Sequence, residues 1–172
     1  MPDVYDFELS DTGLSTFLVV CQSYKSMSKL AGARLGKVGL TSESLGVLWA
    51  CRDYPDTVIP AEISRMIYRE NNSVAVLLNG LEKDGHISRI PKRKGQPYTE
   101  IKITQKGLQA LASGTAILKD VVTKLTSGLS PEEHEQLQRL GRQLRDKALQ
   151  ELHLEVGPHK NSKLPQPPPL NW

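Results

Sequence analysis

The sequence is poor in cysteine, in aromatic residues and in long apolar runs. Its two cysteines, Cys21 and Cys51, lack the close spacing of a metal or redox motif. We therefore expect reduced core thiols, since a redox switch would need an exposed thiolate of low pKa. Aromatic residues make up 5% of the chain, so aliphatic side chains must build most of the core. No stretch approaches the roughly eighteen apolar residues of a membrane span, and the acidic start of the chain is unlike a secretory signal, which together predict a cytoplasmic protein.

The net charge is only +3, but it is distributed unevenly along the chain. The first eleven residues carry four acids and no base. The segment 89–106 instead has one acid, Glu100, and six bases: Arg89, Lys92, Arg93, Lys94, Lys102 and Lys106. A local basic cluster on a nearly neutral protein indicates a polyanionic partner at one place. The alternative is a solvated surface hairpin without a partner.

Apolar residues in the first half of the chain recur at the three- and four-residue spacing of amphipathic helices. This spacing predicts a helix over about 11–31, followed by a glycine-rich connector over 32–39. A second helix is predicted from the Thr41 cap to about residue 53. A third begins at Pro60, which suits the first helical position, and a fourth begins near Ser73 and stops at Gly85.

The pattern then changes to the alternation of β-strands, over 86–90 and 99–103. The intervening residues 91–98 are basic and rich in turn formers, so we predict a β-hairpin. A long helix follows over about 105–127. The last helix is introduced by Ser130, Pro131 and Glu133, a capping box with proline at the first position, and runs to about residue 156. The proline-rich tail 157–172 should be extended, or polyproline-like, by itself.

The order helix, short strand, helix, helix, hairpin is that of a winged helix-turn-helix. The fold class expected is thus mainly α with a small β-hairpin wing. We expect a first helix and connector over 1–39, the winged segment over 40–104, two further helices over 105–156 and the tail over 157–172.

The helices outside the winged segment carry more apolar surface than about sixty-five residues of winged segment can cover. We therefore predict a homodimer in which these helices interlock. Two-fold symmetry would suit a pseudo-palindromic DNA site with two half-sites. An intramolecular three-helix bundle beside the winged segment is the alternative.

Several segments together resemble the multiple-antibiotic-resistance regulator (MarR) family. They are Leu40-Thr41, Pro60-Ala61-Glu62-Ile63-Ser64, Leu81-Glu82-Lys83-Asp84-Gly85-His86-Ile87-Ser88-Arg89, Ile103-Thr104-Gln105-Lys106-Gly107 and Ser130-Pro131-Glu132-Glu133. The resemblance implies a dimeric, sequence-specific regulator of transcription, typically a repressor, that is not an enzyme and holds no cofactor or metal. This chain departs from the family at the wing tip, which reads Gly95-Gln96-Pro97 where an aspartate and an arginine are usual. Arg93 is then the best candidate for a minor-groove contact.

The residues expected to contact DNA fall into three groups. Asparagine can pair bidentately with adenine, and small apolar side chains can meet thymine methyl groups; for Asn72 the alternative is a helix cap. The recognition-helix candidates are Asn71, Asn72, Ser73, Ala75, Val76 and Asn79. The wing candidates are Arg89, Lys92, Arg93 and Lys94, and the phosphate candidates are Ser42, Arg65 and Arg69.

The resemblance also implies a small aromatic or anionic effector bound beside the winged segment. The candidates for its pocket are Phe17, Tyr24, Trp49, Arg52 and Tyr54, and the alternative is that they only pack the junction between the first two helices. The four histidines lie far apart in the sequence, which does not favour a catalytic or metal centre. A protein-interaction module is the alternative function, and the basic wing favours nucleic acid over it.

Overall fold

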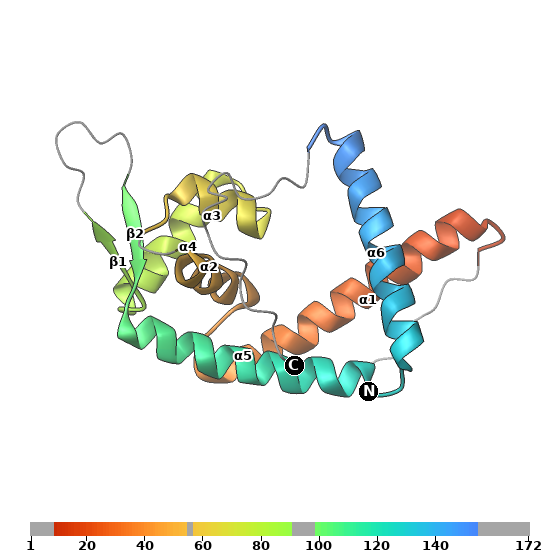
Figure 1. The fold of residues 1–172 in the computed structure, drawn as a ribbon, viewed down its shortest axis with the longest axis horizontal. Helices are drawn as coiled ribbons and strands as arrows, with labels where there is room; N and C mark the ends of the chain where they lie inside the picture. Colours follow the sequence, from red (N-terminus) through yellow and green to blue (C-terminus); the bar gives the residue numbers. More distant parts are fainter. Residues whose placement is uncertain (1–8, 55–56, 91–98, 155–172) are drawn as a thin grey trace.

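The structure is a computed structural model that describes residues 9–54, 57–90 and 99–154. Its elements, in chain order, are α1 (Thr12–Leu35), a short 3₁₀ helix η1 (Gly36–Val38), α2 (Ser42–Asp53), α3 (Pro60–Ile67), α4 (Asn71–Lys83), β1 (Ile87–Ile90), β2 (Glu100–Ile103), α5 (Gln105–Thr126) and α6 (Pro131–Glu151) (Figure 1). The expected helical fold with one hairpin is confirmed. Within these residues, every helix is too short or too polar to cross a membrane.

The helix starts follow from local capping. Thr41 and Ser44 form a reciprocal capping box at α2, and Ser130 and Glu133 form another at α6. Pro60 occupies the first turn of α3, where its missing N–H leaves no intrahelical bond unmade. The starts predicted from the sequence for these three helices are confirmed.

The first helix is longer than its sequence pattern predicts. α1 continues through Gly32 to Leu35, and η1 takes up part of the expected connector. Leu35 is fully buried in the core. Burying a leucine is worth about 1.5–3 kcal/mol, whereas a glycine inside a helix costs about 1 kcal/mol relative to alanine. Burial of Leu35 therefore outweighs the weak helix propensity of Gly32.

The hairpin is antiparallel, with Ile87 opposite Ile103 and Ile90 opposite Glu100. Ile87 and Ile101 turn toward the core while Ser88 and Lys102 face solvent. Val58, from the short β-branched run before α3, forms an isolated bridge with Ile101. This bridge holds the start of the helix-turn-helix against the hairpin.

One continuous core joins α2, α3, α4, the hairpin and the adjoining parts of α1 and α5. Its largest fully buried side chains are Leu35, Leu45, Leu48, Ile63, Leu78, Ile101, Val47, Val58 and Val74. All except Leu35 belong to the segment 40–104. The winged segment thus supplies most of this core. The end of α1 and one face of α5 complete it.

The face of α5 that packs on this core contains glycines as well as apolar side chains. Gly107, Leu111, Gly114 and Val121 are buried, while Leu108, Val122 and Leu125 are exposed. A Cβ built on Gly114 would lie 2.6 Å from Cδ1 of Leu45. The close approach of α5 to α2 therefore depends on glycine, which a search for apolar side chains does not detect.

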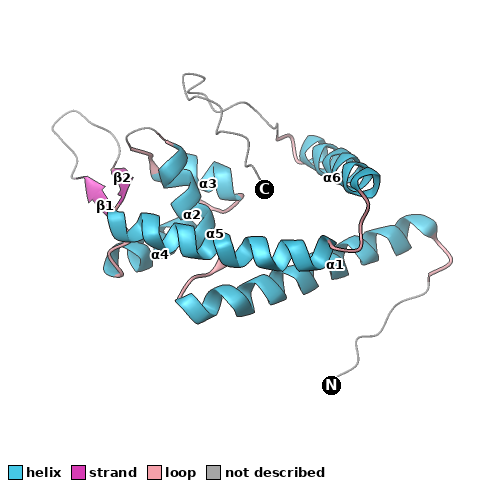
Figure 2. Ribbon diagram, turned by 60° about the horizontal axis from the view of Figure 1, so that its bottom comes forward, coloured by secondary structure: helices cyan, strands magenta, loops and turns pink. Residues whose placement is uncertain are grey.

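The three helices outside the winged segment do not form a bundle by themselves. α1 and α5 pack together, but α6 packs along neither of them and only its Leu149 is buried (Figures 1 and 2). The alternative of an intramolecular three-helix bundle is wrong for this reason. The leucine line of α6 remains exposed, with Leu137 at 59% and Leu144 at 53%.

Candidate nucleic-acid interface

The exposed face of α4 carries all six recognition-helix candidates. Val74, Leu78 and Leu81 are buried and fix which side of α4 turns inward. Asn72, Ser73, Ala75, Val76 and Asn79 lie away from that side and Asn71 lies at the start of the helix, three residues before Val74; all six are exposed. Val76 is 71% exposed. This surface carries no charged side chain until Glu82.

The start of α4 corrects two expectations. The helix begins at Asn71, and Glu70 is its N-cap without a side-chain cap bond. Asn72 therefore lies inside the first turn, and its interpretation as a cap is wrong. The side-chain carbonyl of Asn71 accepts a hydrogen bond from the Ser64 hydroxyl at 2.7 Å. That bond ties α4 to α3, so part of the hydrogen-bonding capacity of Asn71 is used within the fold.

Each described arginine among the DNA-contact candidates is paired with an acid. Arg65 pairs with Glu62 one turn earlier, and Arg69 with Glu43 at 2.6 Å. The Glu62–Arg65 spacing is visible in the sequence, but the Arg69 pair joins residues 26 positions apart. Exposed pairs of this kind are worth about 0–1 kcal/mol. Phosphate groups can therefore replace these carboxylates at little cost.

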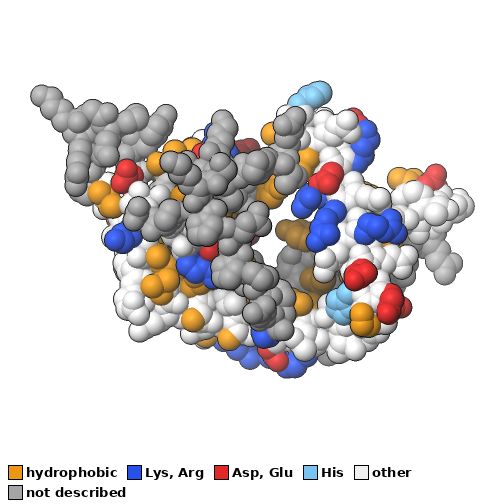
Figure 3. Space-filling view, in the orientation of Figure 1, with side chains coloured by type: hydrophobic (Ala, Val, Ile, Leu, Met, Phe, Trp, Pro, Cys, Tyr) orange, Lys and Arg blue, Asp and Glu red, His pale blue; other side chains and the backbone are white. Residues whose placement is uncertain are grey.

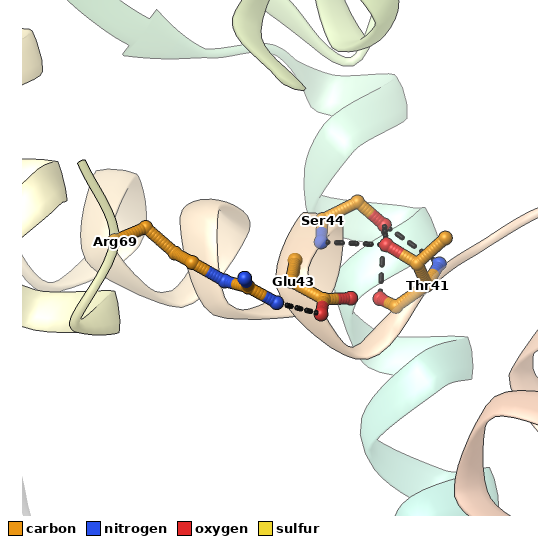
Figure 4. A network of polar contacts seen from close by, with 4 residues as sticks. All are labelled: Thr41, Glu43, Ser44 and Arg69. Atoms are coloured by element: carbon orange, nitrogen blue, oxygen red, sulfur yellow. Dashed lines mark hydrogen bonds and ion pairs between the residues drawn. The ribbon is translucent and has the colours of Figure 1, made fainter. Parts of the chain in front are cut away.

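The Arg69–Glu43 pair lies at the N-terminus of α2 (Figure 4), and the phosphate candidate Ser42 is the first residue of that helix. The Ser44 backbone N–H donates to the Thr41 hydroxyl at 3.0 Å, and the Thr41 N–H donates to the Ser44 hydroxyl at 2.8 Å. A hydrogen bond from its own backbone N–H, followed by the Arg69 guanidinium, lowers the pKa of the Glu43 carboxyl. Glu43 is therefore ionised at neutral pH and competes for the groups that a phosphate would use.

Arg89 connects β1 to the exposed face of α4. Its guanidinium lies 3.0 Å from a Glu82 carboxylate oxygen and donates a 2.6 Å hydrogen bond to the side-chain oxygen of Asn79. One wing candidate is thus attached to one recognition-helix candidate. The other wing candidates, Lys92, Arg93 and Lys94, lie outside the described residues.

A junction at the end of the hairpin fixes the angle between the wing and α5. The Thr104 hydroxyl donates to the Gly85 carbonyl at 2.7 Å, and the Lys106 ammonium donates to the Asp84 carbonyl at 2.7 Å. Lys106, counted in the basic cluster, thus caps the C-terminus of α4. A Cβ on Gly107 would lie 2.0 Å from the His86 carbonyl oxygen, so only glycine fits there. None of these roles is apparent from the sequence.

The five effector-pocket candidates do not meet within one chain. Phe17 and Tyr24 are exposed, at 64% and 68%. Phe17 is eighteen residues before Leu35, or about 27 Å along α1, and the buried residues of α1 are at its Leu35 end. Tyr54 is buried and its hydroxyl donates to Glu62 at 3.3 Å, while Arg52 pairs with Asp53. Trp49 packs partly buried against the core. Within one chain, Trp49, Arg52 and Tyr54 therefore make contacts of their own and form no pocket with Phe17 and Tyr24.

The two cysteines lie in different settings. Cys51 is buried in the core, and burial raises the pKa of its thiol to about 12, so the thiolate needed for redox chemistry is strongly disfavoured. Cys21 is partly exposed on α1. In the described part of the chain, no three His, Cys, Asp or Glu side chains gather as metal ligands.

No protein-family model matches the chain, and no curated protein matches it. Solved structures do match it over most of its length. A mutant of MarR from E. coli complexed with operator DNA covers 80% of this chain with 99% of its own, at a TM-score of 0.70 and 17% identity. The transcriptional regulator BldR from Sulfolobus solfataricus covers 81% with 99% of its own, at 0.68 and 21%.

The organohalide-sensing transcriptional regulator RdhR, in its 2,4-dichlorophenol-bound form, covers 92% of this chain with 96% of its own, at a TM-score of 0.79 and 20% identity. This coverage takes in the helices outside the winged segment as well as the winged segment itself. The proteins named in these structures are transcriptional regulators rather than enzymes. At the level of the fold, the resemblance found in the sequence is confirmed: the chain has the winged-helix fold of the MarR-family regulators.

Proposed function

We propose that the chain binds double-stranded DNA as a homodimer and regulates transcription, as a repressor. The observation that carries the proposal is the exposed face of α4, polar and apolar but uncharged, presented beside the hairpin. An α-helix of this kind fits the major groove, where amide and hydroxyl groups meet base edges and small apolar groups meet thymine methyls. The structure of MarR with operator DNA supports the same use of this fold.

The arginines around this face support phosphate binding. Arg65 and Arg69 are exposed, and each is held only by a surface ion pair. Phosphates release condensed counterions when they bind such residues, which makes binding favourable and dependent on salt. The basic wing residues Lys92, Arg93 and Lys94 add to the same charge, as the sequence predicts.

The homodimer is supported by the apolar residues that one chain leaves exposed. They lie on α1, α5 and α6 and include Leu14, Phe17, Tyr24, Met27, Val122, Leu125, Leu137, Leu140 and Leu144. Figure 3 shows basic side chains in blue along α6, with hydrophobic side chains in orange beside them. A second copy would cover these apolar side chains and place two recognition helices on one duplex. Light scattering should give about twice the 19.1 kDa chain mass.

A small aromatic or anionic effector would bind where two copies meet. The reason is that one chain does not bring Phe17 and Tyr24 to Trp49, so the expected pocket needs the partner's helices. The RdhR structure holds 2,4-dichlorophenol, which supports a phenolic ligand class. Chlorinated phenols should raise the melting temperature and release DNA; a melting temperature unchanged by millimolar ligand would count against the effector.

DNA binding is tested with a pair of matched variants. Ala75 on α4 and Ala112 on α5 are both exposed helical alanines. Ala75→Glu puts a charge and bulk into the proposed groove contact and should weaken binding to a selected duplex by about tenfold or more, while Ala112→Glu should not. The duplex comes from selection on a random pool. If the wild-type protein retains no duplex, or both variants bind equally well, the protein-interaction alternative replaces the proposal.

A further inference from the structure

Arg89 fixes the orientation of the Asn79 side-chain amide. The amide therefore cannot flip to exchange the positions of its oxygen and nitrogen when it meets DNA. Arginine has only N–H donors, so the Asn79 atom that faces the guanidinium at 2.6 Å must be the oxygen. The amide nitrogen is thereby turned toward the remaining side of the group. Its orientation follows from the chemistry of its partner rather than from the similar shapes of oxygen and nitrogen.

Arg89 is itself held in place by α4. Glu82 is three residues after Asn79, on the same side of the helix, and its carboxylate lies 3.0 Å from the second terminal nitrogen of Arg89. The guanidinium therefore bridges two side chains of one helix from the neighbouring strand β1. Asn79 is exposed, and both members of the Arg89–Glu82 pair are partly exposed.

The bridge changes what Asn79 can recognise. Bidentate pairing with adenine uses the amide oxygen to accept from the N6 amino group and the amide nitrogen to donate to N7. Here the Asn79 oxygen already accepts a hydrogen bond from the Arg89 guanidinium. An adenine amino group that used the second lone pair of this oxygen would lie beside the guanidinium N–H groups, so two sets of donors would face each other. Guanine offers acceptors at both O6 and N7, which suits a surface that presents only donors.

We infer that Asn79, positioned by Arg89 and Glu82, reads an acceptor edge, guanine N7 and O6, instead of adenine. This inference rests on the proposed function, since it requires α4 in the major groove. It revises the adenine pairing expected from the sequence for this residue alone. Arg89 is here a positioning residue for base recognition and not a phosphate contact.

The experiment is selection from a random duplex pool with the full chain, followed by affinities for single-base variants of the selected site. We expect a guanine in each half-site whose preference is lost in Asn79→Ala. Replacing that guanine with 7-deazaguanine, which lacks the N7 acceptor, should weaken wild-type binding by about five- to a hundredfold. The same replacement should leave Asn79→Ala unaffected.

Arg89→Gln tests the positioning role, with Arg65→Gln as a control that removes the same charge nearby. Arg89→Gln should shift the preference at the Asn79 position from guanine toward adenine, while Arg65→Gln should weaken all duplexes without changing that preference. The inference is overturned if Asn79→Ala relaxes the preference for an adenine, if it changes no base preference, or if Arg89→Gln behaves like Arg65→Gln. A wild-type protein that retains no duplex at all would instead overturn the proposed function.

Discussion

The winged segment 40–104 and the leucine line of α6 expose their leucines to opposite degrees. In the winged segment Leu45, Leu48 and Leu78 are fully buried by residues of the same chain. On α6, by contrast, Leu137, Leu140 and Leu144 face solvent. Apolar periodicity is equally clear in both regions. It reports that a face must be covered, and it does not report which chain covers it.

The largest effect should come from placing charge on the exposed leucine line of α6. Leu140→Glu with Leu144→Glu should convert the dimer to a monomer, because each buried leucine contributes about 1.5–3 kcal/mol and a dimer loses four. The dissociation constant should rise by at least about a thousandfold, measured by sedimentation equilibrium.

The control for this pair is Gln138→Glu with Gln150→Glu. Both glutamines lie on α6 more than about 100° around the helix axis from the centre of the line formed by Leu137, Leu140 and Leu144, and the control adds the same charge as the leucine pair. The control should remain a dimer. If the leucine variant also remains a dimer, a second copy does not cover the leucine line of α6, and the contrast between α6 and the winged segment fails.

The second effect separates the regions by protein concentration. Leu48→Ala should lower the free energy of unfolding by about 2–5 kcal/mol at every concentration, since the cavity lies within one chain. Leu144→Ala should lower the unfolding midpoint only where the dimer forms, because its burial depends on association. Denaturant titrations at two concentrations, above and below the dissociation constant, distinguish them. An equal loss from Leu144→Ala at both would show that α6 packs within its own chain.

The third effect concerns glycines where the winged segment meets the helices outside it. Gly107→Ala should destabilise the protein by about 1–3 kcal/mol, because the new Cβ would lie 2.0 Å from a backbone carbonyl and 2.8 Å from Ile103. Gly32→Ala should instead stabilise it by about 0.5–1 kcal/mol, since no atom lies within 4 Å and alanine favours the helix. Thermal denaturation of both variants decides it. A destabilising Gly32→Ala would contradict the extension of α1 through the predicted connector.

The order of elements was predictable because each one has a local cause. Ser130 and Glu133 are three residues apart, so their capping box is legible in the sequence, and Gly85 takes the left-handed conformation (φ 74°) expected after α4. The face of α5 was not predictable in this way. Its contact with α2 is made by Gly114, which carries no side chain and adds nothing to an apolar pattern.

The proposed DNA-binding face was predictable as an exposed surface but not as a network of ion pairs. Burial of Val74, Leu78 and Leu81 determines which α4 residues are exposed, and their spacing is in the sequence. The pairs Arg69–Glu43 and Arg89–Glu82 join different elements, so they depend on the tertiary fold. An exposed arginine and a paired arginine have the same sequence signal.

The smallest effect should come from the proposed DNA-binding face of the winged segment, where exposed charge rather than burial is decisive. Glu43→Gln removes the carboxylate that holds Arg69, and exposed pairs are worth only about 0–1 kcal/mol, so the unfolding midpoint should barely change. Affinity for a random duplex should rise a few-fold, because Arg69 no longer has to leave the Glu43 carboxylate before it binds a DNA phosphate. The plot of log affinity against log salt should steepen by up to about 0.9 per subunit. The pKa of the Glu43 carboxyl is lowered, so the wild-type competitor is charged at every pH near neutrality and the difference should not depend on pH there.

Glu70→Gln is the matched control, since Glu70 is exposed, adjoins Arg69 in the sequence and loses the same charge. If general repulsion of the duplex were the cause, the two variants would gain equally. If Glu43 acts through Arg69, the gain from Glu43→Gln should vanish in an Arg69→Gln background, whereas any gain from Glu70→Gln should persist. A double-mutant cycle of duplex affinities at two salt concentrations measures this coupling directly. Zero coupling between Glu43 and Arg69 would mean that their ion pair has no influence on DNA binding. The winged segment and α6 would then differ in their apolar surfaces alone.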